Sequence, residues 1–277
     1  MRSCKMPSGT KMPVFGIGTW RMGESARRRP QELEAVKYAI ELDYPMIDTA
    51  EMYGDGGAEE IIGEALAGRR TLPFIVSKVY PHNATRAGTI AACERSLKRL
   101  GIERIDLYLL HWRGGARLEE TFEAFHRLRA AGKIADFGVS NFDTDDMQEL
   151  WQLPGGEETQ TNQVLYNLGR RGIEWDLLPW LRPRGVPIMA YSPVEQGRLL
   201  GKRTLAALAQ RRGATPAQVA IAWLLHQDGV VAIPKATRPE HVRENRGALD
   251  LALSPEDLAE LDAAFPPPKR KTSLAML

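Results

Sequence analysis

Five apolar segments of this chain each lead into a chemically reactive side chain. They are PMIDTAEMYG at 45–54, FIVSK at 74–78, LYLLHW at 107–112, FGVSNF at 137–142 and IMAYSP at 188–193. In a closed βα barrel every strand presents its carboxyl end at one face, and catalytic groups collect at that face. The pattern therefore predicts that Asp48, Tyr53, Lys78 and His111 meet at one end of a parallel sheet.

Regular alternation of strand-like and helical segments supports an α/β fold of this kind. Parallel strands need a crossover for each return to the same edge of the sheet, and helices provide it. Strand-like runs lie near residues 14–18, 44–48, 73–77, 105–110, 135–139, 159–163, 187–191 and 230–233. Helical patterns lie at 30–43, 58–68, 85–100, 119–131, 144–151, 174–183, 216–227 and 239–248.

The sequence thus predicts a (β/α)8 TIM barrel with additions at both ends of the chain. Two short strands about Ser8-Gly9 form a β-hairpin that caps the bottom of the barrel. A short C-terminal tail at 266–277 is expected to lie over the barrel mouth or to be disordered. Ser254-Pro255 has the signature of a helix start, with a capping side chain before a proline at the first helical position.

Length and composition suit one domain. With 277 residues, of which 43% are hydrophobic, the chain can bury one large core, so we expect a single domain over 1–277. A net charge of +2 gives no strong field for nucleic acid, and Cys4 and Cys93 lie in no metal-binding spacing, so no metal is predicted. The N-terminus lacks a signal-peptide core, and no run of about 18 apolar residues could cross a bilayer. We expect a cytoplasmic monomer without nucleic-acid or membrane partners.

The four converging side chains form a coherent proton-donating group. Tyrosine has a reference pKa of about 10, so it donates poorly at neutral pH unless a nearby cation stabilises the phenolate. Lys78 is the candidate cation, and Asp48 on the neighbouring strand is its expected carboxylate partner. His111 ends the next strand, where it can hydrogen-bond a carbonyl oxygen beside Tyr53.

Each of these residues also has an ordinary structural interpretation. Asp48 and Glu51 have the spacing of a capping box, and Tyr53 precedes a glycine, as aromatic residues of loops often do. Lys78 fits a snorkelling strand-end lysine, and His111 fits a core histidine with satisfied hydrogen bonds. Taken singly, each structural interpretation is the commoner case. Their conjunction at consecutive strand ends favours a catalytic group.

Seven short motifs follow one another along the chain. They are IDTAEMYG, the strand end at Lys78, LLHW, GVSNF, TNQVLYN at 161–167, AYSP and IPK at 233–235. In this order they resemble the aldo-keto reductase superfamily, and the resemblance runs from about Phe15 to Asn245. The segment GTWRMGE at 18–24 and the short C-terminus are further similar to bacterial members that reduce methylglyoxal.

The resemblance implies an NADPH-dependent reductase of small and aromatic aldehydes or ketones. Asp48, Tyr53, Lys78 and His111 would be its catalytic tetrad, with Tyr53 as the general acid. The implied cofactor contacts are Ser140, Asn141 and Gln163 at the nicotinamide carboxamide, Tyr191 stacked on the nicotinamide ring, Lys235 at the 2′-phosphate, Glu244 and Asn245 at the adenine, and in addition Thr19, Trp20, Ser192, Thr237, Arg238 and His241. Trp20, Tyr80 and Trp112 follow strand ends and are candidate walls of the substrate pocket, although a tryptophan is more often part of a core.

The sequence departs from the family pattern at the expected 2′-phosphate site. Ala236 stands where a serine is usual, and His241 stands where an arginine is common. Both changes remove hydrogen-bond donors, so we expect NADPH to be preferred with some weaker use of NADH. No G-x-G-x-x-G follows a strand, so the nucleotide would be held by loops of the last barrel strands.

Two other classes of function are compatible with a barrel of this kind. A nucleotide-binding regulatory module on the same fold would retain NADPH tightly and turn over slowly. An unrelated barrel hydrolase would need a second acid facing Asp48 or a cluster of metal ligands, and the sequence offers no convincing candidate for either.

Overall fold

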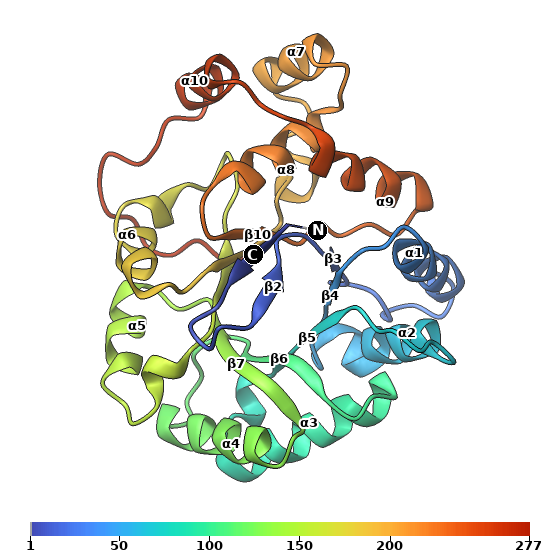
Figure 1. Ribbon diagram of the computed structural model, residues 1–277, viewed down its shortest axis with the longest axis vertical. Coiled ribbons are helices and arrows are strands. Elements are labelled where there is room, and N and C mark those ends of the chain that lie inside the picture. The colour runs from blue at the N-terminus through green and yellow to red at the C-terminus, as the bar shows by residue number, and fades with distance from the viewer. Residues whose placement is uncertain (1) are drawn as a thin grey trace.

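The computed structural model of the protein describes residues 2–277, in which eight parallel strands form one sheet (Figure 1). The strands are β3 (Ile17–Gly18), β4 (Met46–Asp48), β5 (Phe74–Val79), β6 (Ile105–Leu110), β7 (Ile134–Ser140), β8 (Asn162–Leu165), β9 (Ile188–Tyr191) and β10 (Val230–Ala232), and they neighbour one another in chain order. Parallel bridges join Phe15 to Ala232 and Gly18 to Lys235, so the two edges of the sheet meet. The N–H groups of Gly16 and Gly18 donate across this seam at 3.0 and 3.1 Å. The predicted (β/α)8 barrel is confirmed.

Helices surround the strands at the positions that the sequence pattern predicts. They are α1 (Arg29–Glu41), α2 (Gly57–Leu66), α3 (Arg86–Leu100), α4 (Leu118–Ala130), α5 (Thr144–Trp151), α6 (Leu177–Leu181), α8 (Pro216–His226) and α9 (Pro239–Arg246). The helix expected over 174–183 is instead divided into the 3-10 turn η4 (Gly172–Glu174), α6 and the 3-10 turn η5 (Arg182–Arg184). Pro183 lacks the N–H that a continuous helix needs, which explains why α6 ends before it.

Two further helices lie outside this ring. The helix α10 (Pro255–Ala264) begins at the capping box of Ser254, as the sequence signal indicates. The helix α7 (Arg203–Arg211) was not predicted, although Leu205, Leu208 and Ala209 give it one buried side at helical spacing. Figure 1 shows both helices at the periphery, where α7 packs against α8 and α10. No helix within residues 2–277 has the length and apolar character needed to span a bilayer.

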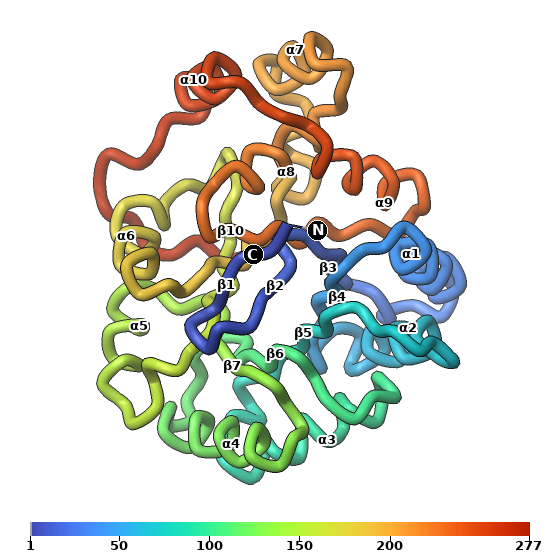
Figure 2. The backbone as a smooth tube through the Cα atoms, viewed as in Figure 1, coloured from blue at the N-terminus to red at the C-terminus, as the bar shows by residue number. Residues whose placement is uncertain are grey.

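The N-terminal hairpin closes one end of the barrel. Its strands β1 (Ser3–Lys5) and β2 (Lys11–Pro13) pair antiparallel, and Figure 2 shows them across the centre of the ring of strands. Met6 and Met12 are fully buried in a cluster with side chains from the barrel interior, among them Met46, Leu107 and Met189. The hairpin therefore seals the bottom of the barrel with apolar side chains, as predicted.

The chain returns from α10 to the opposite end of the barrel. In Figure 2 the red tube passes α6 and ends near the centre of the molecule. Lys271 lies 3.4 Å from Asp145 and 3.2 Å from Asp176, which holds the tail beside α5 and α6. The backbone of Leu277 lies near the hydroxyl of Tyr191, at the carboxyl end of β9, and its proximity lowers the pKa of that hydroxyl against the larger effect of burial. Of the two states expected for residues 266–277, the structure shows the tail over the barrel mouth.

Truncating Met12 should test the hairpin seal. The Met12 side chain has no exposed surface, so Met12→Ala removes buried contacts and leaves a cavity. We expect a loss of about 2–5 kcal/mol in the free energy of unfolding, measured by denaturant titration. Lys11→Ala, at the exposed neighbouring position, is the control. A Met12→Ala loss no larger than that of the control would contradict a sealing role.

Candidate active site

A buried ion pair forms the centre of the barrel mouth. Lys78, near the end of β5, has no exposed surface, and its Nζ lies 2.9 Å from both carboxylate oxygens of Asp48 at the end of β4. Nζ also donates to the Thr49 carbonyl at 2.7 Å. The amide of Gln163 on β8 donates to Asp48 Oδ1 at 2.7 Å from across the barrel. The capping interpretation of Asp48 is therefore wrong: its carboxylate serves Lys78 and Gln163.

Tyr53 brings its phenol to this ion pair. Its hydroxyl oxygen is 3.4 Å from Lys78 Nζ, and its side chain is almost fully buried. Tyr53 opens the 3-10 turn η1 (Tyr53–Gly56), in which Gly54, Asp55 and Gly56 have φ of 59°, 53° and 90°. Three successive left-handed residues turn the chain sharply into α2. Glycine adopts this conformation without steric cost, and aspartate tolerates it better than most residues.

His111 completes the group from the next strand. It follows β6 directly, its ring meets that of Tyr53 edge to face with centroids 5.6 Å apart, and 7% of the residue is exposed. Within residues 2–277 the buried Nδ1 atom of His111 has no hydrogen-bond partner. The four predicted side chains therefore come together from β4, β5 and β6, which are neighbours in the barrel.

Burial governs the protonation of this group. Burial, with the Asp48 charge, raises the pKa of Tyr53 well above its usual value. The pKa of the phenol therefore stays above its usual value although Lys78 is near, because burial and the Asp48 charge outweigh the Lys78 cation, which Asp48 meets at 2.9 Å. Burial also lowers the pKa of Lys78, opposed chiefly by Asp48, and burial with the Lys78 charge holds the pKa of His111 well below its usual value. The site thus carries a protonated phenol and a neutral imidazole.

Polar side chains at the ends of β7, β8 and β9 lie beside the tetrad. Asn141, at φ 59°, donates to the His111 carbonyl at 3.1 Å and accepts from the Tyr191 hydroxyl at 2.9 Å. Ser140 donates to the Gln163 carbonyl at 2.8 Å. The four residues expected at a nicotinamide ring, Ser140, Asn141, Gln163 and Tyr191, are therefore brought together. They already bond to one another or to tetrad residues.

Three other expected cofactor residues occupy different surroundings. Thr19 is fully buried, and its N–H and hydroxyl both donate to the Asp48 carbonyl, at 3.0 and 2.9 Å. Trp20 is partly buried, with the Arg21 guanidinium 4.5 Å from its ring centroid. Ser192 has φ 50°, and its carbonyl accepts from the Asn167 amide at 2.9 Å. Thr19 thus supports the backbone at Asp48, and its N–H and its hydroxyl hydrogen are both used for this.

The residues expected at the adenosine end lie on one rim of the barrel. Lys235 follows β10 and is exposed, while Arg238 and His241 contact each other at the start of α9. Thr237, between Lys235 and Arg238 in the sequence, is partly exposed, and Glu244 and Asn245 lie further along α9. Partial desolvation lowers the pKa of Lys235, while the charge of Glu32 opposes this shift. The rim is therefore positively charged and open to solvent.

Two of the expected pocket aromatics stand next to the tetrad. The rings of Tyr80 and Trp112 meet edge to face with centroids 5.2 Å apart, and Trp112 lies 4.8 Å from the ring of His111. Both residues are partly exposed, so they are placed to form a wall beside the imidazole. Tyr80 is held by its backbone N–H, which donates to the Glu51 carboxylate at 2.8 Å.

Three buried carboxylates near the site were not predicted as functional. Glu51 binds the turn at Tyr80, Glu59 binds Ser77 and Arg99, and Glu195 binds Asn167 and Arg170. Each joins segments far apart in the sequence, so no local spacing identifies it. The only local signal was the position of Glu51 and Glu59 on either side of Tyr53.

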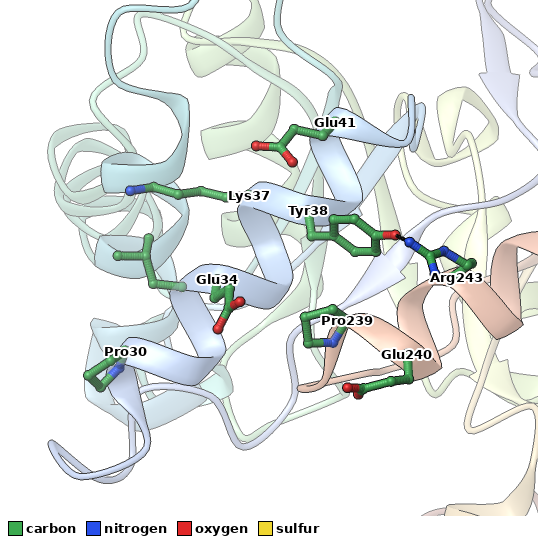
Figure 3. A pocket seen from close by; sticks show the side chains of 9 residues that line it. Pro30, Glu34, Lys37, Tyr38, Glu41, Pro239, Glu240 and Arg243 are labelled. Carbon is green, nitrogen blue, oxygen red and sulfur yellow. Dashed lines mark hydrogen bonds between the residues drawn. The ribbon is translucent and has the colours of Figure 1, made fainter.

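Other features of the surface lie apart from the tetrad. Between α1 and α9 an outer groove is lined by Pro30, Leu33, Glu34, Lys37, Tyr38, Glu41, Pro239, Glu240 and Arg243. Figure 3 shows the Arg243 guanidinium meeting the Tyr38 hydroxyl across it, and none of the candidate site residues lines it. Across residues 2–277, no three His, Cys, Asp or Glu side chains gather in a way that suits a metal ion.

Comparison with known proteins identifies the family. The model of the aldo/keto reductase family matches residues 14–265. The chain belongs to the aldo/keto reductase family. Methylglyoxal reductase YeaE of Escherichia coli (strain K12) is 52% identical over 271 residues, which are 96% of this chain and 95% of the relative. Glyoxal reductase of Bacillus subtilis (strain 168) is 36% identical over 261 residues, 94% of this chain and 91% of the relative.

A solved structure extends the comparison to the whole fold. The aldo-keto reductase from Klebsiella pneumoniae in complex with NADPH is 49% identical, with a TM-score of 0.96, and the match covers 100% of this chain and 99% of that one. This aldo-keto reductase is therefore an oxidoreductase with the barrel of its family.

The protonation states predict the pH dependence of aldehyde reduction. A raised pKa keeps the Tyr53 phenol protonated as the pH rises, and a lowered pKa keeps His111 neutral as the pH falls. We therefore expect kcat/KM to change little between about pH 6.5 and about pH 10, the ordinary values of the two groups. A steady-state profile with a descending limb near neutral pH would contradict the raised pKa of Tyr53.

Proposed function

We propose that the protein reduces small and aromatic aldehydes and ketones, methylglyoxal among them, with NADPH, and that Tyr53 is the general acid. The observation that carries the proposal is the Tyr53 hydroxyl, 3.4 Å from Lys78 and beside a neutral His111 at the barrel mouth. A reductase of methylglyoxal at 52% identity supports the substrate class. The loop at 113–118 is short and contains two glycines, which favours small substrates.

The polar groups at the mouth suit NADPH. A carboxamide needs donors and acceptors, which Ser140, Asn141 and Gln163 provide, and Tyr191 offers an aromatic face for the nicotinamide ring. The exposed cation of Lys235, three positions before Arg238 in the sequence, suits the 2′-phosphate. When bound, NADPH supplies the hydride, and the protein supplies position and charge.

The proton step follows from the geometry of the tetrad. A carbonyl oxygen that accepts hydrogen bonds from the Tyr53 hydroxyl and the His111 imidazole would gain negative charge in the transition state. Donors fixed in a site shielded from water stabilise such charge strongly. Tyr53 then gives up its proton, and Lys78 beside it stabilises the phenolate that remains. Asp48 keeps Lys78 in place throughout.

Removing the Tyr53 hydroxyl tests the assignment. Tyr53→Phe keeps the ring and loses the proton, so we expect methylglyoxal reduction to fall at least about 100-fold. The affinity for NADPH, measured by fluorescence titration, should barely change. Tyr38→Phe, on the outer surface between α1 and α9, is the matched control. Normal turnover by Tyr53→Phe would refute its role as the acid, and no NADPH oxidation by the wild type with any aldehyde would refute the activity.

Cofactor choice tests Lys235. NADH lacks the phosphate that Lys235 would meet, so Lys235→Met should raise the KM for NADPH about 10-fold or more and leave that for NADH nearly unchanged. Arg238→Ala and His241→Ala should have smaller effects. At this site the set of hydrogen-bond donors is already reduced, because Ala236 and His241 stand where a serine and an arginine are usual. Equal losses with both cofactors would show that none of these residues reads the phosphate.

A further inference from the structure

The left-handed turn after Tyr53 contacts a buried charged cluster formed by residues of α2, β5 and α3. Glu59, in the first turn of α2, has no exposed surface, and its Oε2 accepts from Arg99 Nε at 2.7 Å, with Nη2 at 2.6 Å. Its Oε1 accepts from the Ser77 hydroxyl at 2.6 Å. We refer to Glu59, Ser77 and Arg99 as the Glu59 cluster.

One contact of the cluster fixes the strand that carries Lys78. Ser77 immediately precedes Lys78 on β5, and alternate residues of a strand point to opposite faces. Lys78 therefore points into the barrel mouth while Ser77 points outward to Glu59. Because both residues share one stretch of backbone, the hydrogen bond from Ser77 to Glu59 restrains the position of the Lys78 side chain.

The second contact covers the turn that carries Tyr53. A Cβ atom on Gly56 would lie 2.6 Å from Arg99 Nε, so the guanidinium rests directly on this left-handed glycine. On the other side of the turn, a Cβ on Gly54 would lie 2.6 Å from the carbonyl carbon of Gly23. The turn is thus enclosed between Arg99 and the backbone at Gly23, and Glu59 keeps Arg99 in place.

We propose that Glu59 is a positioning residue for the reaction: through Ser77 and Arg99 it holds the β5 strand end and the Tyr53 turn in one arrangement. This inference rests on the proposed role of Tyr53. The cluster also has an electrostatic consequence, since Glu59 and Arg99 together are neutral. Loss of either charge leaves the other unpaired beneath the site: Arg99 lies against Gly56 of the Tyr53 turn, and the charge of Glu59 favours the protonated form of Lys78.

Ser77→Ala separates position from charge. It removes one hydrogen bond and leaves Glu59 and Arg99 paired, so the fold should persist. We expect kcat for aldehyde reduction to fall about 10-fold, as small displacements of reacting groups do, with the KM for aldehyde and the affinity for NADPH unchanged. Wild-type kcat in this variant would overturn the positioning role.

Charge variants give a readout that a merely structural role would not produce. Alcohol oxidation, the reverse reaction, needs Tyr53 as the phenolate, so its rate should rise at alkaline pH. Glu59→Gln leaves the Arg99 cation, which favours the phenolate, so this rise should move to lower pH by about half a unit to one unit. Arg99→Gln should move it to higher pH, and the double variant should return close to the wild type. Glu60→Gln and Lys98→Gln, at exposed neighbouring positions, are the controls.

The outcomes distinguish this inference from the proposed function. An active Tyr53→Phe enzyme would refute the general acid itself. An inactive Tyr53→Phe enzyme, together with unshifted pH profiles in both charge variants, would refute only the inference about Glu59. Opposite shifts that cancel in the double variant, with reduced kcat in Ser77→Ala, would establish it. Thermal melting of each variant shows that the measured rates refer to folded protein. Where a charge variant does not fold, the kcat of Ser77→Ala alone decides the inference.

Discussion

The ion pair of Lys78 and Asp48 is the interaction on which the rest of the site depends. An ammonium group without exposed surface is tolerated only when nearly all its donors are used, and Lys78 meets two carboxylate oxygens and the Thr49 carbonyl. Removing one partner of such a buried pair typically costs about 3–5 kcal/mol. Thr19 and Gln163 in turn hold Asp48. The side chains of Asp48, Lys78 and Gln163, from β4, β5 and β8, are therefore joined around one charge, and the folded barrel is a condition for this arrangement.

Backbone packing fixes the position of Tyr53, as the ion pair fixes the position of Lys78. The turn after Tyr53 lies against other backbone segments, and side chains at Gly23, Gly54 or Gly57 would clash with one another's main chain. Such contacts leave little room for the phenol to move. The phenol is buried, and its pKa rises for that reason. A proton donor that releases its proton only to a strongly basic acceptor suits a transition state in which negative charge develops on oxygen.

Local sequence signals predicted the frame and the tetrad but not the groups that support them. Apolar runs that end in Asp48, Lys78 and His111 located the barrel mouth, because each strand and the reactive residue at its end are adjacent in the sequence. The roles of Glu59 and Glu195 depend on partners 18 to 40 residues away, such as Ser77, Arg99 and Asn167, which no local spacing reveals. The raised pKa of Tyr53 was not predicted for the same reason: it depends on burial and on the Asp48 charge, which outweigh the nearby Lys78 cation.

The two ends of the proposed cofactor site differ in their physical character. The tetrad is buried, so its charges interact in a medium of low effective dielectric and salt screens them little. Lys235, Arg238 and His241 are exposed, so their attraction for a phosphate weakens with ionic strength. Ala236 is buried at the rim. Burial chiefly lowers the pKa of Lys235, and the charges of Arg28 and Arg21 lower it further, while those of Glu32 and Glu24 oppose the shift. These charged residues lie before α1 and in its first turn, so the electric field at this rim comes from that segment as well as from α9. Cofactor preference can therefore change through surface charges on either segment without any change in Asp48, Tyr53, Lys78 or His111.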